Sequence, residues 1–309
     1  MTKILLLDKV AKEAVNMLKK VEGFEVDAEN ELTLEQKTER MPDYDACVIR
    51  SATKFDKALL DAGKKLKLII RAGEGTDNID KPYAAEKGIA VENTPGQNSH
   101  AVAELALGHM FSLARHLPRA DETMHKGTWD KKNLAGTELK GKTLGIIGSG
   151  KIGHDLAGMC KALGMRTVAF DVVQNAKDIE YVDMDTLLST ADYISIHVPL
   201  NDKTRDLIKK AELSKMKKTA YIINCARGGI INEKDLADAV KEGIIKGAAV
   251  DVYTEEPVKP ENPLIGVPGI LLTPHLGAST AEAENNCSTA AAEQIIAFFK
   301  ENKVLNKVN

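Results

Sequence analysis

Three glycines directly follow an apolar run and form the pattern Gly148-Ser-Gly-Lys-Ile-Gly153. After a buried strand, the first glycine of such a pattern makes a tight turn and the second lets backbone N–H groups approach a pyrophosphate. The third lets the following helix pack on the sheet, and the positive N-terminal end of that helix favours phosphate. An acid at the end of the next apolar run can bond ribose hydroxyls. The spacing predicts an NAD site made by Gly148, Gly150, Lys151, Ile152, Gly153 and Asp171.

Two other nucleotide sites fit the same stretch less well. The run from Gly145 to Lys151 nearly spells an ATPase phosphate loop, but that motif needs a Ser or Thr next, and Ile152 has no hydroxyl. Asp171 is followed by Val-Val-Gln, with no Arg to receive a 2′-phosphate, which the carboxylate would also repel. The sequence therefore favours NAD over ATP and over NADP.

Polar residues follow three further apolar runs of the same region. Arg227 comes after the run 220–224, Glu255 and Glu256 come after 247–251, and His275 comes after 270–273. Because the carboxyl ends of parallel strands meet at one edge of a sheet, we expect an Arg, a carboxylate and a His beside the dinucleotide. Each has an ordinary structural explanation alone, but together they suit a single reaction.

The composition narrows the class of protein. A chain of 309 residues has room for two domains, and its net charge of −3 gives no reason to expect nucleic acid. Four dispersed cysteines without a Cys-x-x-Cys pair predict a reduced, cytoplasmic protein with no disulfide and no metal site. No apolar run is long enough to serve as a membrane span or a signal peptide, so we expect no membrane partner.

The elements that position these residues alternate between strand-like and helix-like patterns. Strands are expected at 3–7, 24–27, 46–50, 66–71 and 89–92, and again at 143–147, 167–170, 193–197, 220–224, 247–252 and 270–273. This alternation predicts an α/β fold of two Rossmann-like, doubly wound parallel-sheet domains with a cleft between them.

Two long helices connect the domains in this interpretation. Ser99 is a good N-cap for a helix over 101–117 that Pro118 ends, and Ser279-Thr-Ala-Glu282 resembles a capping box for a helix reaching about Phe299. Since the last helix follows the second domain, we expect it to pack on the first. The expected domains are a flavodoxin-like substrate-binding domain, 1–97 plus 285–309, and an NAD-binding domain, 98–284.

Nearly the whole chain resembles the D-2-hydroxyacid dehydrogenase family, most closely its D-3-phosphoglycerate dehydrogenase branch. The glycine loop and the Arg, Glu and His are typical of the family as a whole. The runs at 50–54 and 275–280 point to that branch. The resemblance is carried by Arg50-Ser-Ala-Thr-Lys54, Arg71-Ala-Gly-Glu-Gly-Thr-Asp-Asn78, Asn93-Thr-Pro95, Gly148–Gly153, Asn224-Cys-Ala-Arg-Gly-Gly229, Asp251-Val-Tyr-Thr-Glu-Glu-Pro257 and Pro274-His-Leu-Gly-Ala-Ser-Thr280.

The resemblance implies catalytic roles for Arg227, Glu256 and His275. Arg227 would bind the substrate carboxylate and reacting oxygen with its fixed, permanently charged fork of donors. His275 would take the hydroxyl proton, because an imidazole with the ordinary pKa of about 6.5 suits a general base. Glu256 would hold the other ring nitrogen. Glu256 is preferred to Glu255 only because the family's acid directly precedes Pro.

The resemblance also implies binding residues in both domains. Asp251 would accept from the nicotinamide amide, beside the backbone of Cys225 and Ala226. The loop 71–78 would present N–H groups to the substrate carboxylate, basic side chains would hold a distal phosphate, and the crossing segment would add a polar contact. The implied substrate residues are Arg50, Lys54, Arg71, Gly73, Glu74, Gly75 and Asn98.

Two departures from the family pattern affect these expectations. Glu74 puts an acid in the carboxylate-binding loop, and its side chain would disfavour an anionic substrate if it faced the cleft. The sequence stops at Asn309, so we expect a short form without the C-terminal regulatory domain of longer relatives, and hence no feedback inhibition by serine through that domain.

The expected activity is NAD-dependent oxidation of 3-phospho-D-glycerate to 3-phosphohydroxypyruvate, the entry step of serine biosynthesis. The alternative within the family is a glyoxylate/hydroxypyruvate or D-lactate-type reductase. A more distant alternative is a non-enzymatic NAD(H)-sensing protein like the corepressors of this fold. The stretch 101–139, with Trp129, resembles the family's dimer arm and implies a homodimer.

Overall fold

The computed structural model describes residues 1–29 and 32–309, and the chain divides into two compact units. Unit 1 comprises Met1–Asn98 and Ala278–Asn309, and unit 2 comprises Ser99–Gly277. We expected the chain to return to the first domain at residue 285. It returns earlier, at Ala278. The reason is that the last helix belongs to unit 1 from its first turn, where Glu284 pairs with Lys9 and Arg50.

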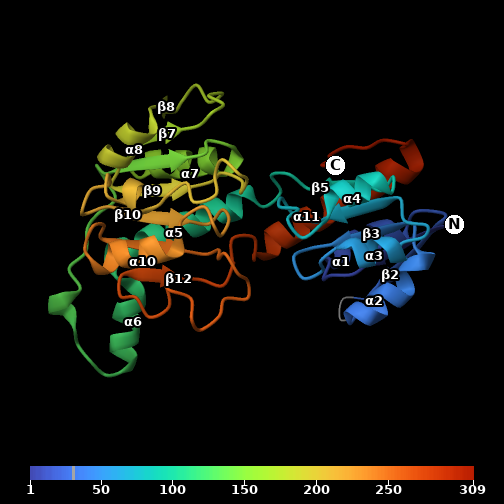
Figure 1. Cartoon of the computed structure of the whole chain (residues 1–309), viewed down its shortest axis with the longest axis horizontal. Coiled ribbons are helices and arrows are strands. Elements are labelled where there is room, and N and C mark those ends of the chain that lie inside the picture. Colours follow the sequence, from blue (N-terminus) through green and yellow to red (C-terminus); the bar gives the residue numbers. More distant parts are fainter. Residues whose placement is uncertain (30–31) are drawn as a thin grey trace. The chain divides into compact units, whose positions relative to one another are not determined.

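Unit 1 is an open sheet covered by helices on both faces (Figure 1). Its five strands are all parallel and stand in the order β2-β1-β3-β4-β5, the flavodoxin-like order. The elements are β1 (Thr2–Leu6), α1 (Lys12–Lys19), β2 (Phe24–Ala28), α2 (Leu34–Arg40), β3 (Ala46–Ile49), α3 (Lys57–Ala62), β4 (Leu68–Arg71), α4 (Lys81–Glu86), β5 (Ala90–Asn93) and α11 (Ala281–Glu301).

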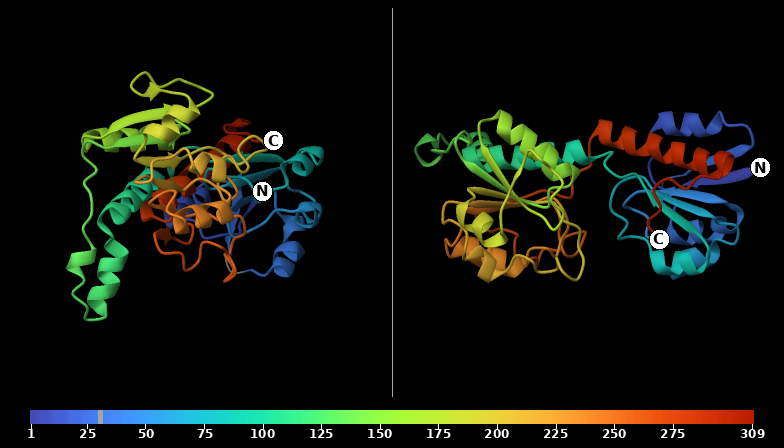
Figure 2. Two further views of the ribbon diagram at one scale, coloured as in Figure 1. Left: turned by 60° about the vertical axis from the view of Figure 1, so that its left-hand side comes forward. Right: turned by 90° about the horizontal axis from the view of Figure 1, so that it is seen from above.

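The strands of unit 1 are apolar on both faces, as buried parallel strands must be. In β4, Ile69 packs into the layer with α3, whereas Leu68 and Ile70 pack into the layer with α1 and α11. Helix α11 runs beside α1 over that second face (Figure 2). Thr280 caps its N-terminus by accepting from the N–H of Ala283.

Unit 2 is a larger sheet of the same kind. Its seven strands are parallel and stand in the order β12-β11-β10-β9-β6-β7-β8. The elements are α5 (Ser99–Arg115), α6 (Leu117–His125), β6 (Thr143–Ile147), α7 (Lys151–Ala162), β7 (Arg166–Phe170), β8 (Glu180–Tyr181), α8 (Met184–Thr190), β9 (Tyr193–Ile196), α9 (Lys210–Leu213), β10 (Tyr221–Asn224), α10 (Glu233–Lys241), β11 (Gly247–Val250) and β12 (Ile270–Leu272).

The direction of winding in unit 2 reverses at β6, which lies between β7 and β9. In open α/β sheets, ligands bind outside the carboxyl ends of the strands at such a switch point. The glycine loop follows β6 directly, so the fold puts it at the position where a dinucleotide binds. The α/β class with two parallel sheets, predicted from the sequence, is confirmed.

The helix expected over 101–117 is wrong at its C-terminal end. Helix α5 stops at Arg115, and His116 adopts a left-handed conformation with φ of 54°. Pro118 then lies in the first turn of a second helix, α6, where its missing N–H costs nothing. Helix α6 projects away from the sheet of unit 2 (Figure 1).

Candidate active site

The glycine loop is built around two close backbone approaches. Gly148 has φ of 96°, and a Cβ there would lie 2.7 Å from the carbonyl oxygen of His197. A Cβ on Gly153 would lie 2.3 Å from the carbonyl oxygen of Gly148. Both positions therefore require glycine, one for the turn after β6 and one for packing α7 against that turn.

Gly150 has more free space around it than Gly148 and Gly153, the other two glycines of the motif. A Cβ at this position would meet no heavy atom within 4 Å. Gly150 is also the N-cap of α7, and Lys151 and Ile152 are the first residues of this helix of 12 residues. The N-terminal N–H groups thus open onto free space that suits a pyrophosphate, so the residues present fit NAD.

Asp171 lies at the carboxyl end of β7, beside the glycine loop. Its Oδ2 accepts from the backbone N–H of Ser149 at 2.7 Å and from the Ser149 hydroxyl at 3.1 Å. Its Oδ1 accepts from the N–H of Val173 at 2.9 Å. The next residues, Val172 and Val173, are exposed apolar side chains that offer no positive charge to a 2′-phosphate.

Arg227 stands on the turn that follows β10. The Asn224 side chain holds this turn, because its amide donates to the carbonyl of Arg227 at 2.9 Å and its oxygen accepts from the N–H of Ala226 at 3.1 Å. Arg227 itself donates to the Ala226 carbonyl at 2.7 Å. A Cβ on Gly228 would lie 1.9 Å from the backbone of Tyr253, so this glycine lets the Arg227 turn approach the segment that leads to Glu256.

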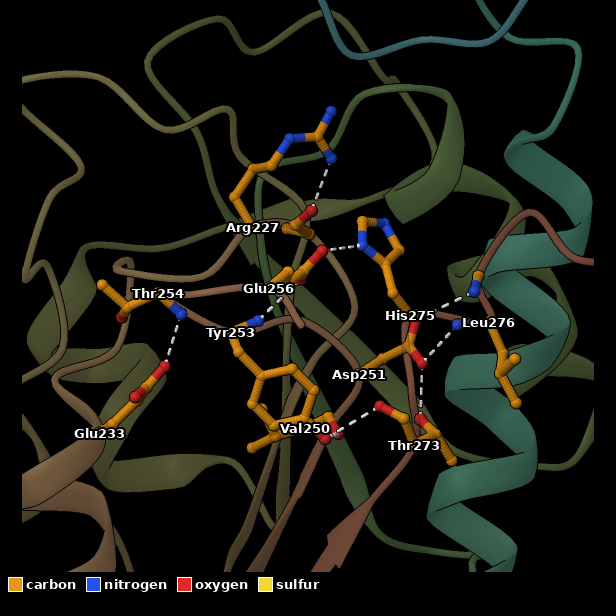
Figure 3. Close-up of polar contacts among 12 residues, drawn as sticks. Arg227, Glu233, Val250, Asp251, Tyr253, Thr254, Glu256, Thr273, His275 and Leu276 are labelled. Atoms are coloured by element: carbon orange, nitrogen blue, oxygen red, sulfur yellow. Dashed lines mark hydrogen bonds and ion pairs between the residues drawn. The ribbon is translucent and has the colours of Figure 1, made fainter. Parts of the chain in front are cut away.

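Glu256 and His275 form a hydrogen-bonded pair (Figure 3). Oε2 of Glu256 lies 2.6 Å from Nδ1 of His275, and Oε1 accepts from the N–H of Tyr253 at 3.0 Å. Burial alone would raise the pKa of Glu256, but the bonds from His275 and Tyr253 and the charge of Arg227 outweigh it and lower that pKa. The structure thus distinguishes Glu256 from Glu255, which is exposed and pairs with Lys259.

Asp251 holds the loop that carries His275. This fully buried carboxylate accepts from the Thr273 hydroxyl at 2.6 Å and from the N–H groups of Leu276 and Gly277 at 2.7 and 2.9 Å. Its backbone carbonyl accepts from the N–H of His275 at 2.9 Å. We expected Asp251 to accept from the nicotinamide amide, and this stays a prediction; the structure adds that the same carboxylate supports the loop of His275.

His109 makes buried polar contacts next to Asp251, one of them to Thr273, whose hydroxyl donates to Asp251. Nδ1 of His109, on α5, is 3.6 Å from Sγ of Cys225, and its Nε2 is 3.3 Å from the Thr273 hydroxyl. Burial lowers the pKa of His109, although the charge of Asp251 partly opposes this, and burial raises the pKa of the Cys225 thiol. Both groups are therefore neutral near pH 7.

In unit 1, the loop 50–54 is held firmly at the end of β3. The buried carboxylate of Asp8 accepts from the N–H of Arg50 at 2.6 Å and from the Thr53 hydroxyl at 2.5 Å. Arg50 pairs with Glu284 at 3.2 Å, whereas Lys54 is exposed.

The loop after β4 brings Arg71 and Gly73 together. A Cβ on Gly73, which has φ of 146°, would lie 1.4 Å from Nη1 of Arg71. Only glycine at position 73 therefore lets this guanidinium lie so close to the backbone of the loop, in which Gly75 is partly exposed. Glu74 bends back onto the segment after β5, where its Oε2 accepts from the N–H of Gly96 at 2.7 Å. Its charge is held at that segment by this bond.

Asn98 is the last residue of unit 1 before α5, and its side chain is buried. Among the residues that the structure describes, no hydrogen-bond partner satisfies its Oδ1. A buried amide oxygen without a partner is costly, and such groups often serve a ligand.

Several residues that shape the site were not identified from the sequence. The seven residues are Asp8, His109, Ser149, Tyr181, Asn224, Gly228 and Thr273. Ser149, Asn224 and Gly228 lie within the quoted motifs, where they were given no role of their own, and Asn224 is a typical turn-forming residue at a strand end. The other four act through contacts to residues distant in the sequence, which no motif marks.

Comparison with known families agrees with this geometry. Residues 107–277 match the family described as D-isomer specific 2-hydroxyacid dehydrogenase, NAD binding domain. The chain belongs to this family. The matched stretch contains the glycine loop, Asp171 and the Arg227, Glu256 and His275 side chains, so the nucleotide that fits the loop is NAD.

Two similar relatives carry different names. The chain is 44% identical over 315 residues to a D-3-phosphoglycerate dehydrogenase of Methanocaldococcus jannaschii, covering 100% of this chain and 60% of the relative. It is also 44% identical over 298 residues to a hydroxypyruvate reductase of Thermotoga maritima, covering 95% and 96%. The chain thus spans about 60% of the length of the first relative.

The fold of the whole chain is also shared with solved structures. A crystal structure of a Thermus thermophilus protein superposes with a TM-score of 0.92 at 29% identity, covering 100% of both chains.

In the part of the chain that the structure describes, no helix is long and apolar enough to cross a membrane. The described residues also contain no group of three or more His, Cys, Asp or Glu side chains able to hold a metal ion.

Proposed function

We propose that this chain is an NAD-dependent dehydrogenase that oxidises 3-phospho-D-glycerate to 3-phosphohydroxypyruvate, with Arg227, Glu256 and His275 as its catalytic residues. The observation that carries the proposal is the 2.6 Å contact between Glu256 and His275 at the carboxyl edge of the NAD-binding sheet. A histidine held in this way by a carboxylate is a general base with a defined orientation.

The contact assigns the protons of the imidazole. Glu256 is ionised, so it accepts, and Nδ1 of His275 must carry the donated proton. Nε2 then bears the lone pair and takes the proton of the substrate hydroxyl as the C2–O bond becomes a carbonyl. The side chain of His275 is 44% exposed, so Nε2 is accessible to a substrate.

Arg227 supplies the positive charge of the site. Its guanidinium binds the substrate carboxylate and the reacting oxygen, which gains negative charge as its proton leaves. NAD, held by the glycine loop and Asp171, would supply the acceptor for the hydride that leaves C2. His275 afterwards gives its proton to solvent, and Glu256 stabilises the imidazolium in the meantime.

The choice of 3-phospho-D-glycerate rests on the names of the relatives and on unit 1. The D-3-phosphoglycerate dehydrogenases of two archaea match over 99% or more of this chain at 41 and 44% identity. We propose that Arg50 and Lys54 bind the phosphate and that the loop 71–75 binds the carboxylate, with Asn98 as a further polar contact. Arg50 would exchange its partner Glu284 for the phosphate.

A second candidate is reduction of hydroxypyruvate or glyoxylate. The Thermotoga maritima hydroxypyruvate reductase matches this chain over nearly its full length. In addition, the carboxylate of Glu284 pairs with Arg50, one of the groups proposed for anion binding, which would favour a substrate with less negative charge. The same catalytic residues serve both reactions.

A substrate panel separates these activities. The purified protein is assayed with NAD on 3-phosphoglycerate, glycerate and D-lactate, and with NADH on hydroxypyruvate and glyoxylate. We expect the highest kcat/KM on the phosphorylated pair. A preference for glycerate and hydroxypyruvate would support the reductase instead, and binding of NADH without turnover of any acid would support a sensing protein.

We further propose that the protein is a cytoplasmic homodimer formed through α6 and the segment after it. Exposed apolar side chains gather there, an arrangement that in a soluble protein often marks an interface. They are Leu117, Met124 and Trp129, the last 78% exposed. Light scattering should give twice the mass of 33.5 kDa for the chain, and Trp129→Ser should shift it toward the single value.

A further inference from the structure

Two hydroxyl groups connect the edge of the unit 2 sheet to Asp171. The hydroxyl of Tyr181, on β8, lies 2.9 Å from Oγ of Ser149, and that Oγ lies 3.1 Å from Oδ2 of Asp171. The Tyr181 oxygen also accepts from the N–H of Ala176 at 3.2 Å. Tyr181, Ser149 and Asp171 therefore form one chain of hydrogen bonds, the hydroxyl relay.

The direction of the relay follows from counting protons. An ionised Asp171 can only accept, so the single proton of Ser149 points to Oδ2. The Ser149 oxygen must then accept, and the proton of Tyr181 points to it. The Tyr181 oxygen accepts in turn from Ala176, so every donor in the relay has an acceptor and every link polarises the next.

The relay limits how Asp171 can move. Its Oδ2 accepts from the hydroxyl and the backbone N–H of Ser149, while its Oδ1 accepts from the N–H of Val173. A carboxylate held at both oxygens is oriented before a ribose arrives, so less side-chain entropy is lost on binding. It also cannot rotate away from a 2′-phosphate, so the repulsion between the two negative charges is retained.

We propose that Ser149 and Tyr181 are positioning residues that act through Asp171 and set the preference of this protein for NAD over NADP. Tyr181 is a specificity-determining residue although it lies ten positions beyond Asp171 on a different strand. The assignment concerns the cofactor alone and holds for any 2-hydroxy acid that the protein oxidises.

The test measures dissociation constants for NADH and NADPH by nucleotide fluorescence, without a substrate. Tyr181→Phe and Ser149→Ala should each weaken NADH about 5-fold, the loss expected for one hydrogen bond, and should leave NADPH unchanged or tighter. Tyr83→Phe is the matched control, since it removes a tyrosine–carboxylate bond in unit 1, to Asp61 at 2.9 Å, and should change neither constant.

The double variant decides whether Tyr181 acts through Ser149. In the Ser149→Ala background, Tyr181→Phe should cause no further change in the ratio of the two constants. An equal weakening of NADH and NADPH, an unchanged ratio, or a full additional effect in the double variant would overturn the proposal. Ser149→Ala removes a single oxygen atom, so this arm of the test stands even if Tyr181→Phe unfolds.

Discussion

Nδ1 of His275 and Oε2 of Glu256 are 2.6 Å apart, and the other oxygen of Glu256 is bonded to the backbone N–H of Tyr253. The carboxylate is thus fixed at both ends and in turn fixes the imidazole. Asp251 holds the backbone on the other side of His275 through Leu276 and Gly277. The proposed base, His275, is therefore oriented through both its ring and its loop before substrate arrives.

Replacing either member of this pair should affect catalysis far more than cofactor binding. His275→Asn removes the proton acceptor and should lower kcat at least about 100-fold, the contribution typical of general acid–base catalysis. Glu256→Gln keeps the shape but loses the charge, so we expect a smaller decrease. Steady-state kinetics together with NADH binding checks this; an equal loss of kcat and NADH affinity would remove the base role of His275.

Gly228 should not tolerate a side chain. Its Cβ would lie 1.9 Å from the backbone of Tyr253, so Gly228→Ala must displace either the Arg227 turn or the segment before Glu256. We expect a lower melting temperature and a marked loss of kcat/KM. Gly158→Ala in α7 is the matched control: nothing lies within 4 Å of its Cβ, and it should stabilise the protein by about 0.5–1 kcal/mol. Equal behaviour of the two variants would contradict this account.

His197 should make the stability of the protein depend on pH. Burial lowers the pKa of His197 to about 4, and its Nε2 lies 2.9 Å from the Ser195 hydroxyl. The unfolded chain takes up a proton near pH 6.5, whereas the folded protein resists it until about pH 4. The stabilisation from the neutral ring is thus present above pH 6.5 and is lost as the pH falls toward 4, by up to about 3 kcal/mol.

Urea unfolding between pH 7 and 4 measures this dependence. His197→Gln should reduce the decrease in the free energy of unfolding over that interval. His100→Gln is the control, because the His100 side chain is 71% exposed and should leave the pH dependence unchanged. The same slope in His197→Gln as in the native protein would show that another group is responsible.

Arg50 should affect the phosphorylated substrate selectively. If its guanidinium binds the phosphate in place of Glu284, Arg50→Gln should raise KM for 3-phosphoglycerate about 10-fold or more, because an ion pair bonded to phosphate is lost. KM for NAD should not change. Arg40→Gln is the control, since Arg40 pairs with Glu29 elsewhere in unit 1. Equal effects on phosphorylated and unphosphorylated acids would contradict the phosphate assignment.

The sequence predicts the parallel sheets and the candidate catalytic residues because both depend on local patterns. Buried parallel strands are continuous apolar runs, and chemistry at a switch point follows the strand ends, as Gly148, Arg227 and His275 do. The end of α5 was predicted wrongly since Pro118 is compatible with both the end and the first turn of a helix. The left-handed His116 between the two helices carries no sequence signal.

The supporting contacts could not be predicted, since they join residues far apart in the sequence. Nothing local indicates that the Asp251 carboxylate faces the loop after β12, or that Asp8 holds the loop at 50–54. Glu74 shows the same limit: its sequence position suggests an acid in an anion-binding loop, and only the fold shows that it bonds to Gly96.

Transfer of deuterium from C2 of the substrate tests the central claim most directly. The protein is incubated with NAD and 3-phosphoglycerate deuterated at C2, and the reduced cofactor is analysed by mass spectrometry. We predict one deuterium in the NADH formed, and at least about 100-fold less deuterated NADH from His275→Asn over the same time. Reduced cofactor without deuterium, or no reduced cofactor from any 2-hydroxy acid of the panel, would contradict the assignment of Arg227, Glu256 and His275 to hydride chemistry.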